Sequence, residues 1–401
     1  MFEALASGRH QQSLREYFGA PGYAELSALA AAAAARKRRG TRGPRILILP
    51  GIMGSKLGAG RGRRKPEVLW IDPLKIAAGR LTALTLPAGQ ALRSMGVLLF
   101  SYARLRLKLQ IDGYQASFFP YDWRQGVEDL GAKLARDLTA DGRPVILVAH
   151  SMGGLVARSA ARRVPKRLVR KLIMLGTPNE GSFAAVQALR GTYPFVRKVS
   201  TLDRRHTAEY LTQKVFHSFP GLYHLLPHRR IKGMDLFNPA DWPADGPLPC
   251  TELLAQAAAA RAALAPADSR MLQIVGVNQE TAVGMRRTAA GFEYIIGRNG
   301  DGTVPLSSAM LPTIKTYFVE ELHANLANNP QVIQAVIDLL RRGRTRELPR
   351  RWLPKRGPMR RVTDAQLRMD DGEKIDWRRL TSAQREAALG ELGSGRLTGQ
   401  L

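Results

Sequence analysis

The sequence predicts an α/β protein in which helices cover a mostly parallel central sheet. Three observations lead to this prediction. An apolar run, Val145 to Ala149, ends at a sharp turn and is followed by a helical stretch that stops at Pro165. Similar buried strands are expected before it, at Arg45 to Leu49, and after it, at Lys171 to Leu175. Because parallel strands need crossover helices, these repeated strand-helix units favour a parallel sheet.

The chain is predicted to begin with a helical arm, residues 1–42. Apolar residues around Tyr17 fall at helical spacing, Pro21 breaks the pattern, and an alanine-rich stretch resumes it. A catalytic domain is expected at residues 43–343. Its segment 56–90 is a long, partly apolar excursion, which suits either a mobile lid or ordinary packed structure.

The β-α rhythm then continues through a strand at Tyr114 to Phe119 and a helix at Val127 to Thr139. From about residue 180 to 270 strands and helices no longer alternate. We expect an inserted cap there that is helical and rich in aromatic residues. The sheet is expected to resume at Met271 to Val277 and Phe292 to Ile296, and to close at Thr316 to Val319.

A basic C-terminal extension is expected at residues 344–401. It contains an acidic stretch, Asp370 to Glu373, and a helix-like stretch, Thr381 to Leu392. Because it lacks a long apolar periodicity, it is either a separate appendage or disordered.

The composition is that of a globular protein: 45% of the 401 residues are hydrophobic and 23% are charged. The single cysteine, Cys250, excludes an intramolecular disulfide and a thiolate zinc site. The N-terminus lacks the apolar core and cleavage site of a signal peptide, and the alanine-rich run 28–35 is too short to span a bilayer. We therefore expect a cytoplasmic protein, able to associate peripherally with a membrane.

The net charge is +28, from 61 basic and 33 acidic residues. Such a field attracts polyanions, either nucleic acid or anionic lipid headgroups. Ten Lys or Arg and one acid lie between Arg341 and Arg361, and shorter basic clusters lie at Arg36 to Arg39 and Arg61 to Lys65. The alternative is an arginine-rich composition with solvated faces and no binding role.

The turn after the apolar strand reads Ala149-His150-Ser151-Met152-Gly153. Strand, sharp turn and helix form the nucleophile elbow of α/β-hydrolases, in which small residues two positions on either side of the serine let strand and helix approach. Ala149 stands where the usual pattern has glycine, a departure of one methyl group. The alternative is a glycine-rich turn with an incidental serine.

A nucleophilic serine needs a base and an orienting acid, which in this fold follow in the order acid, then histidine. Of the seven histidines, only His323 follows a late strand. Asp301 lies in a glycine-flanked loop that can present its carboxylate, with room for a cap insertion before it and one strand after it. The alternative for Asp301 is an ordinary turn sequence. The glycine-bearing turn at Pro50 to Gly54 stands where such hydrolases place an oxyanion donor.

Eight motifs together resemble the lecithin:cholesterol acyltransferase family, which includes lysosomal phospholipase A2 and phospholipid:diacylglycerol acyltransferases. The resemblance spans about residues 45–340. In order, the motifs are LPGIMGSKL, VLWIDPL, FFPYDWR, AHSMGG, GTPNEGS, SFPGLYHLLP, GDGTVP and ELHANL.

The resemblance implies an α/β-hydrolase with a cap and a lid, in which Ser151 is the nucleophile, Asp301 the acid and His323 the base. It also implies an oxyanion hole made by the backbone N–H groups of Ile52 and Met152.

Three further residues fall in family motifs. Asp122 and Arg124 of YDWR form either a structural ion pair or a substrate contact. Trp70 lies in the segment that resembles the family's lid, where the animal acyltransferase carries a disulfide and this chain has no cysteine. We expect the Trp70 segment to govern substrate access, unless Trp70 is a core residue.

The predicted function is that of a serine-dependent acyl-ester hydrolase or O-acyltransferase that acts on lipid esters through an acyl-enzyme. No metal or dissociable cofactor is implied. The expected partners are a lipid substrate and, peripherally, an anionic membrane. The rival prediction is an inactive hydrolase scaffold that binds nucleic acid or anionic surfaces, although no nucleic-acid motif accompanies the charge and no nucleic acid is expected.

Overall fold

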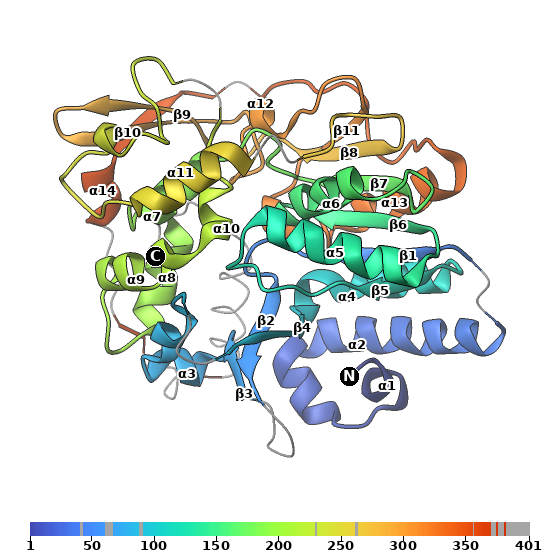
Figure 1. Cartoon of the computed structure of the whole chain (residues 1–401). Coiled ribbons are helices and arrows are strands. Elements are labelled where there is room, and N and C mark those ends of the chain that lie inside the picture. Colours follow the sequence, from blue (N-terminus) through green and yellow to red (C-terminus); the bar gives the residue numbers. More distant parts are fainter. Residues whose placement is uncertain are drawn as a thin grey trace.

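Six parallel strands form the centre of the protein (Figure 1). The computed structural model describes residues 1–40, 43–60, 67–87, 91–228, 231–260, 264–355, 357–369, 374–375 and 381. In spatial order the strands are β11 (Lys315–Val319), β8 (Met271–Gly276), β7 (Val169–Leu175), β6 (Val145–His150), β1 (Arg45–Leu49) and β5 (Gln115–Phe118). This confirms the predicted parallel α/β fold.

The sheet separates two hydrophobic cores because successive side chains of a strand point to opposite faces. Leu147 and Ala149 of β6 pack with helices α5 (Val127–Asp141) and α6 (Met152–Arg163). Ile146 and Val148 pack on the other face with helices α4 (Leu99–Ile111) and α13 (Pro330–Arg342). The central strand β6 is therefore buried along its whole length, and it ends at the predicted nucleophile.

The N-terminal arm folds as α1 (Phe2–Ser7) and α2 (Gln11–Arg38), and Figure 1 shows it beside α4. Arg104 of α4 forms an ion pair with Glu25 of α2. The helix breaks at Gly19, whose φ is 72°, rather than at the predicted Pro21. Pro21 lies in the first turn after the kink. Because N–H groups in the first turn of a helix have no helical acceptor, a proline there costs no hydrogen bond.

A second, antiparallel sheet consists of β9 (Thr281–Thr288), β10 (Gly291–Gly297) and β12 (Arg360–Thr363). The prediction that Phe292 to Ile296 continues the central sheet is therefore wrong, because this segment is the return strand of a hairpin. The hairpin turns at Gly291, whose φ of 98° suits glycine.

Part of the C-terminal extension belongs to this sheet. Strand β12 pairs with β10, and α14 (Asp364–Arg368) follows it. Asp364 accepts a hydrogen bond of 2.7 Å from Nε of Arg190, and both side chains are fully buried. The described part of the extension thus packs on the body, whereas Asp370 to Glu373 and residues 382–392 lie outside the described residues.

The cap lies between β7 and β8, and Figure 1 shows it as the yellow-green helices beside the sheet. It consists of α7 (Phe183–Leu189), α8 (Pro194–Leu202), α9 (Ala208–Lys214), η2 (Phe216–Ser218), α10 (Pro220–Tyr223), η3 (Pro239–Asp241) and α11 (Thr251–Ala260). No helix among the described residues is long and apolar enough to cross a membrane.

The predicted lid segment packs beside the cap. It contains β2 (Ser55–Ala59), β3 (Glu67–Trp70), α3 (Pro73–Ala77) and η1 (Arg80–Leu84). Strands β2 and β3 form a small antiparallel sheet with β4 (Arg93–Val97), which lies beyond the predicted end of the segment at residue 90. The backbone N–H of Leu86 donates to Ser218 of the cap. The basic cluster at 61–65 lies outside the described residues. Just before it, Gly58 belongs to β2 and Gly60 follows that strand. The remaining short elements are α12 (Leu306–Ala309) and η5 (His323–Asn325).

Candidate active site

Ser151 occupies a strained turn between β6 and α6. Its φ of 55° and ψ of −128° are conformations that non-glycine residues rarely adopt, so the surrounding structure must hold them. The following glycines make the turn possible. A Cβ at Gly153 would lie 2.5 Å from the carbonyl oxygen of Pro50, and one at Gly154 would lie 1.9 Å from Oγ1 of Thr177. The Gly-rich elbow predicted from sequence therefore serves close packing as well as the turn.

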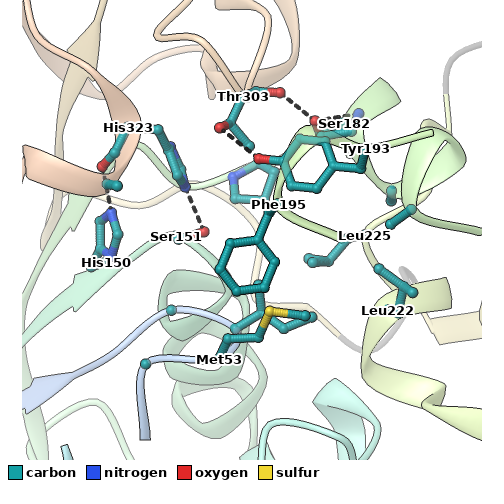
Figure 2. Close-up of a pocket in the computed structure, with 18 of the residues that line it drawn as sticks. Met53, His150, Ser151, Ser182, Tyr193, Phe195, Leu222, Leu225, Thr303 and His323 are labelled. Carbon is teal, nitrogen blue, oxygen red and sulfur yellow. Dashed lines mark hydrogen bonds between the residues drawn. The ribbon is translucent and has the colours of Figure 1, made fainter. Parts of the chain in front are cut away.

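Hydrogen bonds link the side chains of Ser151, His323 and Asp301. Nε2 of His323 is 2.8 Å from Oγ of Ser151, and Nδ1 of His323 is 2.7 Å from Oδ2 of Asp301 (Figure 2 shows the first contact). A carboxylate can only accept, so Nδ1 carries the proton and Nε2 is free to accept the proton of Ser151. All three side chains are buried.

The loop that carries Asp301 is fixed by its own backbone. Oδ1 of Asp301 accepts hydrogen bonds from the N–H groups of Thr303 (3.0 Å) and Val304 (2.7 Å). The backbone N–H of His323 also donates to the carbonyl of Asp301, at 2.8 Å. Acid and base are thus joined twice, once through their side chains and once through the main chain.

The two predicted oxyanion donors flank Ser151. Met152 is the first residue of α6, so its N–H has no acceptor one turn earlier and lies at the positive end of the helix dipole. Ile52 follows Gly51, which lies so close to the nucleophile that a Cβ on it would be 2.9 Å from Cβ of Ser151. Ile52 and Ser151 line the same pocket, and Met152 directly follows Ser151, so both predicted residues lie beside the serine.

An apolar pocket opens above Ser151 and His323 (Figure 2). One wall comes from the cap, and it combines small and large residues. These are Ala184, Ala185, Ala188, Phe195, Val196, Phe216, Leu222 and Leu225. Three polar residues also line the pocket: Ser182 and Tyr193 from the cap, and Thr303 from the loop that carries Asp301. The hydroxyls of Tyr193 and Thr303 lie 3.3 Å apart. Walls of this kind accept a hydrocarbon chain and exclude water.

Trp70 lines the same pocket but is itself 0% exposed. Its indole N–H donates to the carbonyl of Met53 at 2.9 Å, and its ring packs against Trp123 and Phe195 at centroid distances of 5.5 and 5.9 Å. Because both its N–H group and its ring are held by neighbouring residues, Trp70 is a fixed part of the pocket wall. The structure therefore favours the core alternative for Trp70 over a mobile lid.

Asp122 and Arg124 form a bidentate ion pair, with contacts of 2.9 and 2.6 Å. The guanidinium group of Arg124, a residue only 1% exposed, also donates to the carbonyl of Leu84 at 2.8 Å. Neither residue lines the pocket. The geometry thus favours the structural ion pair, which fastens η1 to the body, over substrate contact.

Sequence reasoning missed several residues of the site. Tyr193 and the cap wall carry no motif that could have marked them. His150 lies inside the elbow, next to Ser151, and it contacts Tyr102 and the carbonyl of His323. Burial lowers the pKa of His150 to about 3, so this imidazole is neutral near pH 7. No group of three or more His, Cys, Asp or Glu in the described part of the chain could hold a metal ion.

Fold and site together define an α/β-hydrolase. The family model described as lecithin:cholesterol acyltransferase matches residues 98–339, so the chain belongs to that family. No curated protein sequence matches it.

Among solved structures, a chain of the Tle4-Tli4 complex is 13% identical, with a TM-score of 0.53, over 74% of this chain and 98% of that one. The mature lipase BlEst2 of Bacillus licheniformis is 19% identical, with a TM-score of 0.34, over 70% of this chain and 84% of that one. At 13% identity, the likeness to the chain of the Tle4-Tli4 complex shows the fold alone.

Proposed function

We propose that the protein is a serine esterase that transfers the acyl group of a lipid ester to water or to an alcohol. The observation that carries this proposal is the hydrogen-bonded row of Ser151, His323 and Asp301 beneath an apolar pocket. Membership of a family named for an acyltransferase supports a lipid substrate.

The reaction begins when Oγ of Ser151 attacks the ester carbonyl and Nε2 of His323 takes its proton. Asp301 stabilises the imidazolium that forms. The backbone N–H groups of Ile52 and Met152 stabilise the negative oxygen of the tetrahedral intermediate. His323 then returns the proton to the departing alcohol, which leaves the acyl group on Ser151.

The second half repeats these steps with a different nucleophile. Water or an alcohol gives its proton to His323 and attacks the acyl-enzyme, so hydrolysis and transacylation differ only in the acceptor. The apolar wall formed by the cap holds the acyl chain in both halves. The hydroxyl of Tyr193 in the cap lies beside that of Thr303 in the loop that carries Asp301, and these two groups form a polar part of the pocket.

Labelling with a fluorophosphonate probe tests the nucleophile. The wild type should be labelled, and Ser151→Ala should not. Analysis of the products formed from phosphatidylcholine vesicles, with and without an added long-chain alcohol, then separates free fatty acid from acyl ester. If the wild type resists labelling and instead binds DNA in a salt-sensitive manner, the protein is an inactive scaffold and the proposal is wrong.

A further inference from the structure

A chain of buried hydrogen bonds passes beneath Ser151 and involves none of the three catalytic side chains. The backbone N–H of Gly51 lies 2.9 Å from Oη of Tyr102, which lies 2.9 Å from Nδ1 of His150. Nε2 of His150 lies 2.9 Å from the carbonyl oxygen of His323, and Figure 2 shows this last contact. The chain therefore begins beside the oxyanion loop and ends at the backbone of the catalytic base.

Only one arrangement of protons satisfies every group in this chain. A carbonyl can only accept, so Nε2 of His150 donates to His323. Nδ1 of a neutral imidazole is then bare and accepts from the hydroxyl of Tyr102, which in turn accepts from Gly51. The buried, uncharged state of His150 agrees with this arrangement, because burial lowers its pKa to about 3. At pH 7, each hydrogen bond in this series therefore has one defined donor and one defined acceptor.

The peptide bond between Pro50 and Gly51 is held at both of its polar atoms. Its N–H donates to Tyr102, and its carbonyl oxygen accepts from the hydroxyl of Tyr121 at 2.5 Å. Both tyrosines are buried. Fixing this peptide plane sets the direction of the next one, which carries the N–H of Ile52. That N–H makes no hydrogen bond to any described residue and remains free for an oxyanion.

We propose that Tyr102 and His150 are positioning residues that align the oxyanion loop with the catalytic histidine. This inference rests on the proposed function, since it concerns the same reaction. A preorganised donor stabilises the transition state without reorienting during the reaction. If the loop loosens, the N–H of Ile52 must be ordered at the moment of attack, so kcat falls while binding in the apolar pocket is unchanged.

The variant Tyr102→Phe removes one hydroxyl group and keeps the ring. We expect kcat for a short-chain nitrophenyl ester to fall by about tenfold to a hundredfold, less than the roughly 10²–10³-fold loss that follows removal of an oxyanion donor itself. KM should stay within about twofold. The rate of fluorophosphonate labelling should fall with kcat, because it uses the same donors.

Tyr223→Phe is the matched control. The hydroxyl of Tyr223 is also buried, accepts from a backbone N–H (Cys250, 2.8 Å) and donates to a carbonyl (His217, 3.0 Å), but it lies in the cap and outside the pocket lining. Its removal should disturb packing to a similar degree and change kcat by less than about twofold. A double-mutant cycle with His150→Leu adds a second readout: both changes break one chain, so the double variant should be no slower than the slower single variant.

The outcomes separate this inference from the proposed function. If Ser151 is labelled and Tyr102→Phe retains normal kcat, the positioning role is refuted and the esterase stands. An equal loss in Tyr102→Phe and Tyr223→Phe would also refute it, because the effect would then be general loosening. A wild type that is neither labelled nor active would refute both.

Discussion

The body, which is the central sheet with its flanking helices, and the cap meet at Ser151. They hold their residues in place in different ways. In the body, Ser151 directly follows β6, and His323 begins η5 a short way after β11, so the carboxyl ends of these parallel strands bring the two residues to the same edge of the sheet. In the cap, the pocket wall comes from short helices fastened by scattered contacts, such as the hydrogen bond from Leu86 to Ser218. Changes in the body should therefore alter chemistry, whereas changes in the cap and lid segment should alter stability and access.

The largest expected effect lies in the body. Asp301→Asn and His323→Ala should each lower turnover of a short-chain ester by about 10⁴-fold or more, because members of a triad act as a unit. The protein should stay folded, with a moderately lower melting temperature, since both side chains are buried and hydrogen-bonded. Steady-state kinetics and thermal melting on the same preparations provide the check. Near-normal turnover in Asp301→Asn would mean that another carboxylate orients His323.

Trp70→Ala tests the lid segment, where we expect an effect on stability. Truncating a fully buried tryptophan leaves a cavity, so the free energy of unfolding should fall by about 3–5 kcal/mol. Turnover of a short ester and of vesicle-borne phospholipid should fall together, as both depend on the intact wall. Denaturant unfolding measures the first effect, and paired rate measurements the second.

Leu74→Ala provides the control for Trp70. Leu74 lies on α3 in the same segment but is 53% exposed, so its truncation should change the free energy of unfolding by about 0.5 kcal/mol or less. A selective loss of vesicle turnover in Trp70→Ala, with unchanged stability, would restore the lid function that the sequence suggested.

The contact between His224 of the cap and the start of α5 in the body should make stability depend on pH. His224 of the cap accepts a hydrogen bond from the N–H of Val127 at the start of α5, and burial lowers its pKa to about 4. A histidine whose pKa is lower in the folded state binds more protons when unfolded, so stability is complete above about pH 6.5 and declines as the pH falls towards 4. The decline attributable to His224 should reach about 3 kcal/mol.

Denaturant unfolding between pH 4 and 7 measures this slope. His224→Gln removes the titrating group and should flatten the curve, although His217 and His150, whose pKa values burial also lowers, keep part of it. An unchanged slope in His224→Gln would show that this contact does not titrate.

The smallest effect concerns the basic segment 341–361. Arg360 and Arg361 form ion pairs with Glu280 and Glu293, whereas Arg350 and Arg351 are exposed and pair with no described residue. A free basic group near an anionic surface contributes about 1 kcal/mol. Replacing Arg350 and Arg351 by Gln should therefore weaken binding to anionic vesicles by about 30-fold at low salt.

Cosedimentation at two salt concentrations measures this binding. Replacing Arg360 and Arg361 by Gln is the matched control, with the same change in charge but a smaller expected loss. Equal binding of the wild type to neutral and anionic vesicles would remove the electrostatic explanation.

The contrast between body and cap also explains what could be predicted from sequence. Ser151 and Asp301 could be predicted because each lies in a local motif with its own backbone signature, an elbow and a glycine-flanked loop, and His323 because it follows a late strand. The hairpin of β9 and β10 was misplaced because a short apolar run does not reveal which sheet it joins. Tyr102 and the cap wall could not be found, since their positions depend on contacts between segments far apart in sequence.

The buried pair of Arg190 and Asp364 bears on how the protein is synthesised. These two residues are 174 positions apart, and the later one follows all three catalytic residues. While the ribosome is still adding residues beyond His323, the guanidinium group of Arg190 has only one of its two carboxylate partners, Asp245, and β10 has an unpaired edge where β12 will later pair. The ion pair with Asp364 and the third strand of the second sheet can therefore form only after residue 364 has left the ribosomal exit tunnel.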